Sequence, residues 1–237
     1  NGAGKSTLMS VLFGLYQPEK GVIKVRGQEV KIKGPLDANA LGIGMVHQHF
    51  KLVHNFTVLQ NIVLGMETVR HGFLKMDDAR KKVVGLSERY GLYIDPDALI
   101  QDITVGMQQR VEILKMLYRD NEIMIFDEPT AVLTPQETEE LFERLLELKS
   151  RGMTIIFISH KLNEVKRISD RITVLKGGVT KGTYLTRDVS EEDISNLMVG
   201  REISFEYDKE DVKPGEPVLK VENLVYVDKF NIPKLSG

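Results

Sequence analysis

The first residues of the chain carry a pattern suited to holding phosphate. The end of the pattern G-x-x-x-x-G-K-[ST] is matched by Asn1, Gly2, Ala3, Gly4, Lys5, Ser6 and Thr7. Glycines let backbone N–H groups approach phosphate oxygens, Lys5 offers a charge to the β- and γ-phosphates, and Ser6 offers an oxygen to Mg²⁺. Residues 8–12 predict a helix whose dipole adds to the site. We interpret this segment as a phosphate-binding loop (P-loop) rather than a plain glycine-rich turn.

Two adjacent carboxylates follow an apolar run at residues 123–126. Such a run is typical of a parallel strand covered on both faces, and α/β folds bind ligands at the C-terminal ends of these strands. We expect Asp127 to hold Mg²⁺, directly or through water, and Glu128 to orient or deprotonate an attacking water. The alternative is an acidic pair that only begins a polar loop. The presence of a P-loop in the same chain makes this alternative less favoured.

Two further polar residues follow strand-like runs. Gln48 comes after residues 43–46 and offers Mg²⁺ its amide oxygen, although an exposed loop glutamine is the alternative. His160 comes after residues 154–158, and strand order in such sheets places it near the γ-phosphate, where it hydrogen-bonds phosphate and water. A lone histidine is usually structural or exposed, so its assignment depends on the motifs around it.

The elements that position these residues alternate between strands and helices. Residues 21–33 alternate apolar and polar side chains around a glycine, which predicts an antiparallel β ribbon. Residues 58–120 are mostly helical in pattern. Thr134 and Glu137 form a capping box around Pro135, which predicts the start of another helix. We therefore predict an α/β fold with a mainly parallel sheet, an antiparallel β ribbon and a helical subdomain.

Composition removes several classes of function. The 237 residues include 32 Lys plus Arg and 34 Asp plus Glu, and a net charge of −2 gives no basic field for nucleic acid. The chain has no cysteine, which excludes disulfides, thiol catalysis and Cys-based metal sites and favours a reducing, intracellular compartment. No apolar run approaches the roughly 18 residues of a transmembrane helix. We expect no nucleic-acid partner.

The ends of the chain lead us to expect a fragment of a longer protein. The first Gly of the P-loop pattern would precede Asn1, and a new strand-like segment opens at residues 218–224. Residues 204–217 are charged, carry two prolines and are interpreted as a linker. We expect residues 1–237 alone to be poorly stable and to have little or no activity.

The order of the motifs resembles that of the ATP-binding-cassette (ABC) ATPases within the P-loop NTPases. In that family a signature segment, LSGGQ, lies between the residues matched here by Gln48 and Asp127. Residues 103–112 occupy its place. The signature positions are Thr104, Val105, Gly106, Met107 and Gln108. The resemblance extends from Asn1 to about Gly200.

The resemblance implies roles for these residues in binding and hydrolysing ATP with Mg²⁺. Two cassettes of this family pack head to tail, with ATP between the P-loop of one and the signature of the other. Glu128, His160 and Lys5 then act in catalysis, and the signature serves the opposite site. Nucleotide is held by the P-loop residues 1–7, Gln48 and Asp127. The implied metal ligands are Ser6, Gln48 and Asp127.

A closer resemblance is to the tandem-cassette ATPases of simple-sugar and nucleoside importers, in particular the nucleoside branch. It rests on residues 44–50, 105–115, 131–137 and 198–201. It implies that residues 1–203 are a first cassette without its N-terminal strands and that residues 218–237 are the first strands of a second. The implied function is to energise import of nucleosides or simple sugars.

That resemblance also implies partners and a location. The partners are the second cassette of the same polypeptide, membrane-embedded permease subunits and, indirectly, an extracytoplasmic solute-binding protein. The location is the cytoplasmic face of the cell membrane, as a peripheral subunit. The apolar residues Phe50, Leu52, Val53 and Phe56 are candidates for contact with the permease, and the alternative is that they form the core of the helical subdomain.

The signature departs from the family pattern while the other motifs look intact. Thr104 replaces Ser, Val105 replaces Gly and Met107 replaces Gln, and Thr134 stands where the following D-loop usually has Asp. Val105 adds a branched side chain where glycine lets backbone approach the γ-phosphate. Thr134 has a second explanation as a helix N-cap. We hypothesise that the site built on Lys5 hydrolyses ATP and that the opposite site mainly binds nucleotide.

The alternatives to transport are functions of another class, carried out by cassette proteins without a membrane partner. A DNA-repair cassette would carry long coiled coils between Gln48 and the signature, and residues 49–102 show no sustained heptads. A ribosome-associated cassette would be more basic or carry a charged arm. A purely nucleotide-binding regulatory module would not need Glu128 and His160.

Overall fold

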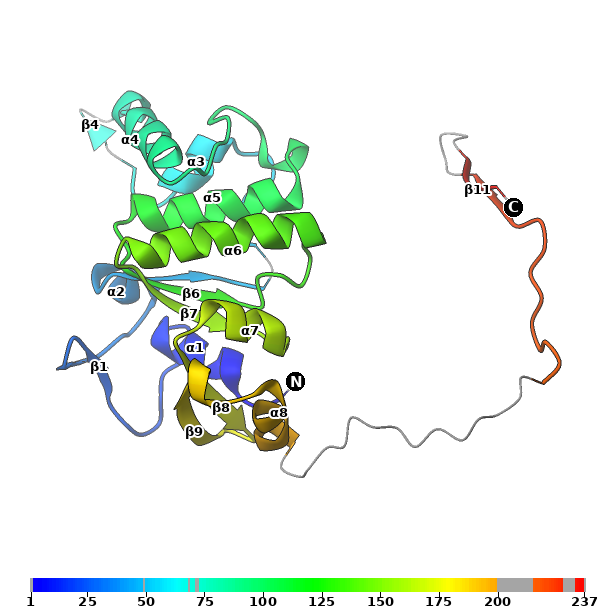
Figure 1. Cartoon of the computed structure of the whole chain (residues 1–237). Coiled ribbons are helices and arrows are strands. Elements are labelled where there is room, and N and C mark those ends of the chain that lie inside the picture. The colour runs from blue at the N-terminus through cyan, green and yellow to red at the C-terminus, as the bar shows by residue number, and fades with distance from the viewer. Residues whose placement is uncertain are drawn as a thin grey trace. The chain divides into compact units, whose positions relative to one another are not determined.

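The computed structural model describes residues 2–48, 50–67, 69–70, 73–199, 215–227 and 233–236 (Figure 1). The chain divides into two compact units, Asn1–Glu202 and Ile203–Gly237. The first unit contains every described residue that the sequence assigns to chemistry, so its architecture determines the site.

A three-stranded parallel sheet lies at the centre of the first unit. Its strands are β3 (Ile43–Val46), β6 (Ile123–Asp127) and β7 (Thr154–Ile158), in the order β3-β6-β7. The register places Val46 opposite Phe126 and Asp127 opposite Ile158. All three strands are the apolar runs that the sequence predicted, and their parallel pairing confirms the predicted sheet.

The two faces of the sheet are covered by different helices. Met124 and Phe126 point into one core, which contains residues of α5 (Val105–Tyr118) and α6 (Pro135–Ser150). Ile125 points the other way, into a second core with Met9 of α1 (Lys5–Leu12). This alternation is the two-residue period of a strand. Figure 1 shows α5 and α6 side by side along one face of the sheet.

The helical subdomain packs on the same side as α5. It comprises α3 (Val58–Val63), α4 (Met76–Arg89), the short 3₁₀ segment η1 (Ile100–Asp102) and α5 itself. Thr57 and Gln60 start α3 with a reciprocal capping box, which satisfies two backbone N–H groups. The mostly helical stretch of the sequence is therefore confirmed. It also contains a hairpin that sequence patterning missed, formed by β4 (Val69–Arg70) and β5 (Phe73–Leu74).

The predicted antiparallel ribbon is formed by β1 (Ile23–Val25) and β2 (Gln28–Val30). Arg26 and Gly27 join these strands, both with positive φ, which suits the right-handed twist of a two-residue hairpin. Between the ribbon and β3 lies α2 (Pro35–Ala40), whose Ala38 is buried in the core beneath α1. The ribbon and α2 therefore belong to the α1 side of the sheet.

A third hairpin and three short elements complete the described part of the first unit. The hairpin consists of β8 (Arg171–Lys176) and β9 (Val179–Leu185). It is preceded by α7 (Leu162–Ile168), which follows β7, and is followed by η2 (Thr186–Asp188) and α8 (Glu191–Val199). Ile172, Val174 and Ile194 form a small core between the hairpin and α8.

The capping box predicted at Thr134 is present at the start of α6. The Thr134 hydroxyl accepts a hydrogen bond from the Glu137 N–H at 3.3 Å, and the Glu137 carboxylate accepts one from the Thr134 N–H at 3.0 Å. Pro135 occupies the first turn, where a missing N–H costs nothing. These contacts hold the pKa of the Glu137 carboxyl below its usual value.

The second unit is described at residues 215–227 and 233–236. It contains β10 (Val225–Val227) and β11 (Pro233–Ser236), which pair antiparallel. The prediction of a strand at residues 218–224 is wrong: within the described part of this unit these residues are exposed and belong to no strand. Asn223 has φ of 52°, a left-handed conformation that interrupts an extended chain. Residues 204–214 of the predicted linker lie outside the described residues.

The described helices are all too short or too polar to cross a lipid bilayer.

Leu145 and Leu146 on α6 provide a direct test of the packing against the sheet. Leu145 is fully buried in the core with Phe126, whereas Leu146 is 37% exposed. In the intact protein, Leu145→Ala should lower the free energy of unfolding by about 2–5 kcal/mol, because it removes packed methyl groups and leaves a cavity. Leu146→Ala should cost less than about 1 kcal/mol. Urea unfolding measures both, and equal losses would contradict this orientation of α6.

Candidate nucleotide-binding site

The N-terminus of α1 is shaped to receive an anion. Gly2 and Gly4 have φ of 92° and 90°, a conformation that side chains with a Cβ rarely adopt. Gly4 is the N-cap residue, so no side chain caps the helix and its first-turn N–H groups remain available. Helix N-termini of this kind bind phosphate through those groups and the helix dipole. Asn1, which the sequence also assigned to this loop, lies outside the described residues.

The turn of the β8–β9 hairpin supports this loop from one side. The Gly178 N–H donates a hydrogen bond to the Ala3 carbonyl at 3.0 Å. A Cβ atom added at Gly4 would lie 3.5 Å from the Gly178 Cα. The loop and the hairpin turn therefore pack backbone against backbone.

Ser6 and Asp127 meet although 121 positions separate them in the sequence. The Ser6 hydroxyl donates a hydrogen bond to Asp127 Oδ1 at 3.2 Å. Asp127 is the last residue of β6 and is buried, while Ser6 lies in the first turn of α1. A hydroxyl and a carboxylate beside an anion-binding helix end are the hard oxygen donors that Mg²⁺ prefers. These two residues fit the metal that the sequence implied.

Glu128 and His160 form a second pair at the same edge of the sheet. The distance from His160 Nδ1 to Glu128 Oε1 is 3.3 Å. Glu128 has φ of 49°, an uncommon conformation for a residue with a side chain, and it directly follows the end of β6. Its N–H still bonds to the Ile158 carbonyl at 2.9 Å, which extends the pairing of β6 with β7. A carboxylate and an imidazole in contact can hold and transfer a proton.

Lys5 and His160 both line a large cavity. The cavity has a volume of about 1090 Å³ and lies between α1, β7 and β8. Gly2 and Ala3 of the P-loop line it as well. The start of α1 and the histidine after β7 therefore face one space.

Among the described residues, Gln48 does not contact Ser6 or Asp127, the other two metal ligands that the sequence implied. It is exposed, and the contacts recorded for the described residues include none from Gln48 to Ser6 or Asp127. Its neighbour His47 packs edge-on against Phe13, with ring centroids 5.9 Å apart. Burial lowers the pKa of the His47 imidazole, the charge of Lys51 lowers it further, and Asp127 acts in the opposite direction.

The signature positions gather at the N-terminus of α5. Thr104 is the N-cap residue, and its hydroxyl accepts a hydrogen bond from the Met107 N–H at 3.3 Å. Val105 opens the helix with 40% of its surface exposed. Gln108 donates through Nε2 to the Ile100 carbonyl at 3.3 Å. The contacts recorded for the described residues do not join these positions to Lys5, Ser6 or Asp127.

Gly106 contacts the capping box of α6. Its N–H donates to Glu137 Oε1 at 3.2 Å, and a Cβ at this position would lie 2.6 Å from that oxygen. Only glycine fits here without displacing the carboxylate. One turn later on α5, Arg110 forms an ion pair with Glu140 of α6. The signature helix and α6 are thus joined by charged groups along one side.

Gln109, which the sequence motifs do not mark out, links α5 to the loop after β6. Gln109 is buried, and its Nε2 donates to the Pro129 carbonyl at 3.1 Å. Pro129 follows Glu128 directly. The available signal was a polar residue on the buried face of an apolar helix.

Two other buried polar residues hold the segment that follows Gln48. Glu112 accepts a hydrogen bond from the Lys51 N–H at 2.9 Å, and burial raises the pKa of its carboxyl. Asn61 accepts from the Val53 N–H at 2.7 Å and donates to the Val53 carbonyl at 3.0 Å. Leu52 is buried in the core of the helical subdomain. Of the apolar residues considered for contact with a permease, Leu52 therefore belongs to the core of the helical subdomain.

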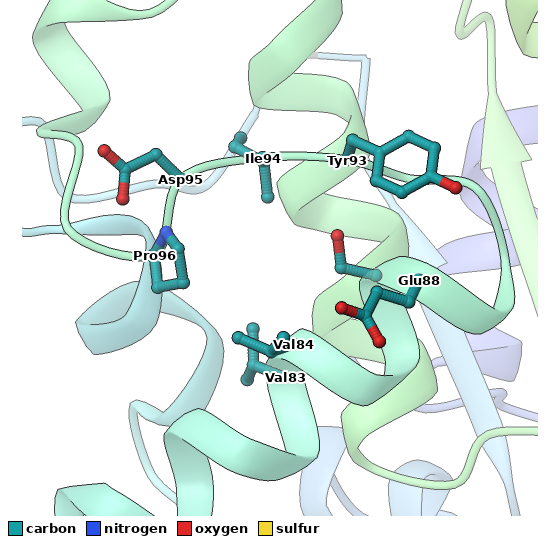
Figure 2. A pocket seen from close by; sticks show the side chains of 8 residues that line it. Val83, Val84, Glu88, Tyr93, Ile94, Asp95 and Pro96 are labelled. Carbon is teal, nitrogen blue, oxygen red and sulfur yellow. The ribbon is translucent and has the colours of Figure 1, made fainter.

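A smaller pocket lies on the helical subdomain and contains none of the residues assigned to catalysis. Its volume is about 460 Å³. It is lined by Val83, Val84, Ser87, Glu88, Tyr93, Ile94, Asp95 and Pro96. Figure 2 shows the side chains of α4 across the pocket from those of the loop that follows the helix. Its lining is apolar with two carboxylates, which suits a protein surface better than a phosphate.

Comparisons with curated proteins give relatives of the same kind. The guanosine import ATP-binding protein NupO of Bacillus subtilis is 53% identical over 232 residues, covering 98% of this chain and 46% of that protein. The nucleoside import ATP-binding protein NupA of Lactococcus lactis is 51% identical over 237 residues, covering 100% and 47%. The glucose import ATP-binding protein TsgD13 of Haloferax volcanii is 44% identical over 265 residues, covering 100% and 48%. The chain therefore spans about half the length of the curated relatives it matches.

Solved structures share the fold, and a family model matches the sequence. The ADP conformation of MJ1267, an ATP-binding cassette of an ABC transporter, aligns with a TM-score of 0.70 at 26% identity, covering 84% of this chain and 81% of that one. CbiO1 of Clostridium perfringens, part of an ABC transporter complex, aligns with 0.65 at 28%, covering 84% and 81%. The model described as "ABC transporter" matches residues 1–131, more than half of the 237. The chain belongs to the ABC transporter family, and its first unit has the fold of an ABC cassette.

Proposed function

We propose that this chain is part of an ATP-hydrolysing subunit that energises the import of nucleosides through an ABC transporter. The observation that carries the proposal is the meeting of Ser6 with Asp127 and of Glu128 with His160, beside a glycine-capped helix N-terminus. The family membership supports ATP as the nucleotide. The choice of nucleosides rests on the two relatives above 50% identity, whose names state guanosine and nucleoside import.

The first task of the site is to bind the phosphates of ATP. The open N–H groups of α1 and the ammonium group of Lys5 neutralise the negative charge of the β- and γ-phosphates. Ala3 and Thr7 complete the loop around the glycines. Because these donors are fixed by the helix before ATP arrives, little reorganisation accompanies binding.

Ser6 and Asp127 would hold Mg²⁺, with Gln48 as a further oxygen donor. When bound, Mg²⁺ neutralises charge on the phosphate oxygens as the γ-phosphoryl group is transferred. Asp127 is well suited because its burial at the end of β6 fixes its position. Gln48 is exposed and needs to turn toward the metal to take part.

Glu128 and His160 act on the attacking water. Glu128 accepts a hydrogen bond or a proton from that water, which aligns it with the γ-phosphorus. His160 contacts Glu128 through Nδ1 and thereby keeps Nε2 for phosphate or water. The reaction is then phosphoryl transfer to water, driven by positioning and electrostatics.

The proposal includes an asymmetry between the two nucleotide sites of the transporter. The exposed side chain of Val105 stands at the end of α5 that would face the opposite nucleotide. Thr104 and Thr134 both serve as helix N-caps, which gives each a role independent of nucleotide. The site built on Lys5 hydrolyses ATP, and the opposite site mainly holds it.

The partners follow from the same proposal. The first partner is a second cassette of the same polypeptide, of which residues 218–237 are the beginning. Membrane-embedded permease subunits contact the helical subdomain, for which the pocket around Val84 and Tyr93 offers an exposed apolar surface. A solute-binding protein acts on the far side of the membrane. The subunit is peripheral, on the cytoplasmic face.

Sugar import is the second candidate function. It is favoured by the relative named for glucose import, which is 44% identical over the whole of this chain. The residues of the nucleotide site do not distinguish the two, because the transported solute does not bind there.

Removing the carboxylate of Glu128 tests both the mechanism and the asymmetry. In the intact protein, Glu128→Gln should lower ATP turnover at least about 100-fold, because the amide cannot accept the proton of water. Binding of a fluorescent ATP analogue should stay near that of the unmodified protein. Glu192→Gln, on the exposed start of α8, is the matched control and should turn over normally. Substantial residual hydrolysis in Glu128→Gln would show that the opposite site also works.

The metal ligands are tested by titrating Mg²⁺. Ser6→Ala removes one oxygen ligand, so the Mg²⁺ concentration for half-maximal ATPase activity should rise at least about tenfold. Nucleotide affinity in EDTA should not change, because Ser6 is not proposed to contact phosphate through its side chain. Ser10→Ala, one turn further along α1, serves as the control. An unchanged Mg²⁺ requirement in Ser6→Ala would remove Ser6 from the metal site.

Uptake in cells tests the transported solute. Cells with the intact gene and cells with Glu128→Gln are compared for uptake of labelled nucleosides, ribose and galactose. We expect nucleoside uptake to be lost in the variant. Loss of sugar uptake instead would keep the importer and contradict the nucleoside assignment. If the mutation changes the uptake of neither nucleosides nor sugars, import of both solute classes is contradicted.

A further inference from the structure

Glu164 is a buried carboxylate that the mechanism above does not use. It lies in the first turn of α7 and is 5% exposed. Its Oε2 accepts hydrogen bonds from the Thr130 and Ser159 hydroxyls, each at 2.9 Å. Its Oε1 forms an ion pair with Lys161 Nζ at 2.9 Å. One oxygen atom therefore joins two segments that are 29 residues apart in the sequence.

The two hydroxyl donors lie next to the two residues assigned to the attacking water. Ser159 immediately precedes His160, and Thr130 comes two residues after Glu128. The Lys161 N–H also donates to the Ser159 hydroxyl oxygen at 3.0 Å. Glu164 thus sits where the loop after β6 and the loop after β7 come together.

The sheet alone does not fix the distance between these loops. The paired positions of β6 and β7 end with Asp127 and Ile158, and the Glu128 N–H to Ile158 bond is the last backbone link between them. Beyond that point His160 is 61% exposed, and its recorded side-chain contact is the one with Glu128. The separation of the two loops therefore depends on side chains that bridge them.

A helix-stabilising role does not account for the burial of Glu164. A carboxylate in the first turn of a helix interacts favourably with the dipole, and an exposed carboxylate does so without losing its hydration. Burying it is costly unless hydrogen bonds and a counter-charge compensate. Here the compensating donors come from the two loops, and an apolar residue would fill the same space without them.

We propose that Glu164 is a positioning residue for ATP hydrolysis: by bridging Thr130 and Ser159 it holds Glu128 and His160 at the distance that the attacking water requires. The inference rests on the proposed function, since it assigns Glu164 to the chemistry of that site. Its effect is on turnover and not on nucleotide binding, because Lys5 and the N-terminus of α1 are not part of this network.

Steady-state kinetics on the intact protein separates positioning from a merely structural role. Glu164→Ala should lower kcat roughly 10- to 100-fold, because small displacements of catalytic groups have effects of this size, while KM for ATP changes less than about threefold. Glu164→Gln should restore most of kcat, since one amide oxygen accepts from both hydroxyls. Equal kcat in Glu164→Ala and the unmodified protein, or loss of kcat in Glu164→Gln as large as in Glu164→Ala, would overturn the proposal.

Two further variants distinguish loss of positioning from a folding defect. Thr130→Val combined with Ser159→Ala removes both donors and leaves Glu164 in place, so it should reproduce the fall in kcat. Arg167→Ala removes an exposed ion pair between α7 and Glu139 of α6 without touching either loop, so kcat should stay unchanged. Normal turnover in the double variant would overturn the bridging role.

A measurement without turnover distinguishes failure of this inference from failure of the proposed function. In crystal structures of the intact protein, the distance from His160 Nδ1 to Glu128 Oε1 should exceed 3.5 Å in Glu164→Ala and stay near 3.3 Å in Glu164→Gln. An unchanged distance in Glu164→Ala would overturn the positioning role, whether or not the unmodified protein hydrolyses ATP.

Discussion

The pairing of β6 with a parallel strand on each edge is the constraint on which the site depends. β3 and β7 pair with the two edges of β6, and the helices on either side of the sheet bury the strand's two faces, with Phe126 in one core and Ile125 in the other. The strand cannot shift by one residue without exchanging these two faces. This register places Asp127 within hydrogen-bond distance of Ser6. It also places Glu128, which follows β6, beside the residues that follow β7.

The helix α5 connects the core of the sheet to the loop after β6 and to α6. Its buried face fills the core above Phe126, and Gln109 reaches from that face to the carbonyl of Pro129. Its N-terminus holds the signature and bonds to Glu137 of α6 through Gly106. A displacement of α5 therefore acts on both its own N-terminus and the loop that carries Glu128. Hydrogen bonds thus link α5 to α6 and to the loop after β6, and breaking one of them alone leaves its partner group unsatisfied at a cost in free energy.

Much of this fold could be predicted from the sequence because its signals are local. The three apolar runs became β3, β6 and β7, and Thr134 with Glu137 became a capping box as predicted. The partners of polar residues that bond across the fold could not be found this way. Gln109 is marked only by its place on the apolar face of a helix, and Glu164 looks like any surface residue until the loops around it are placed. The strand predicted at residues 218–224 failed because apolar alternation does not supply a pairing partner.

The split between intact and altered motifs has a physical basis in how the two groups of residues are connected. Ser6 bonds to Asp127 and His160 contacts Glu128, and Asp127 and Glu128 are adjacent in the chain, so a change in one of these residues disturbs its partner. The signature positions bond instead to α6 and to the backbone before α5, as Gly106 does with Glu137. Val105 has its exposed side chain outside both networks. A branched residue at that position leaves the chain's own site undisturbed, and its effect falls on whatever faces the N-terminus of α5.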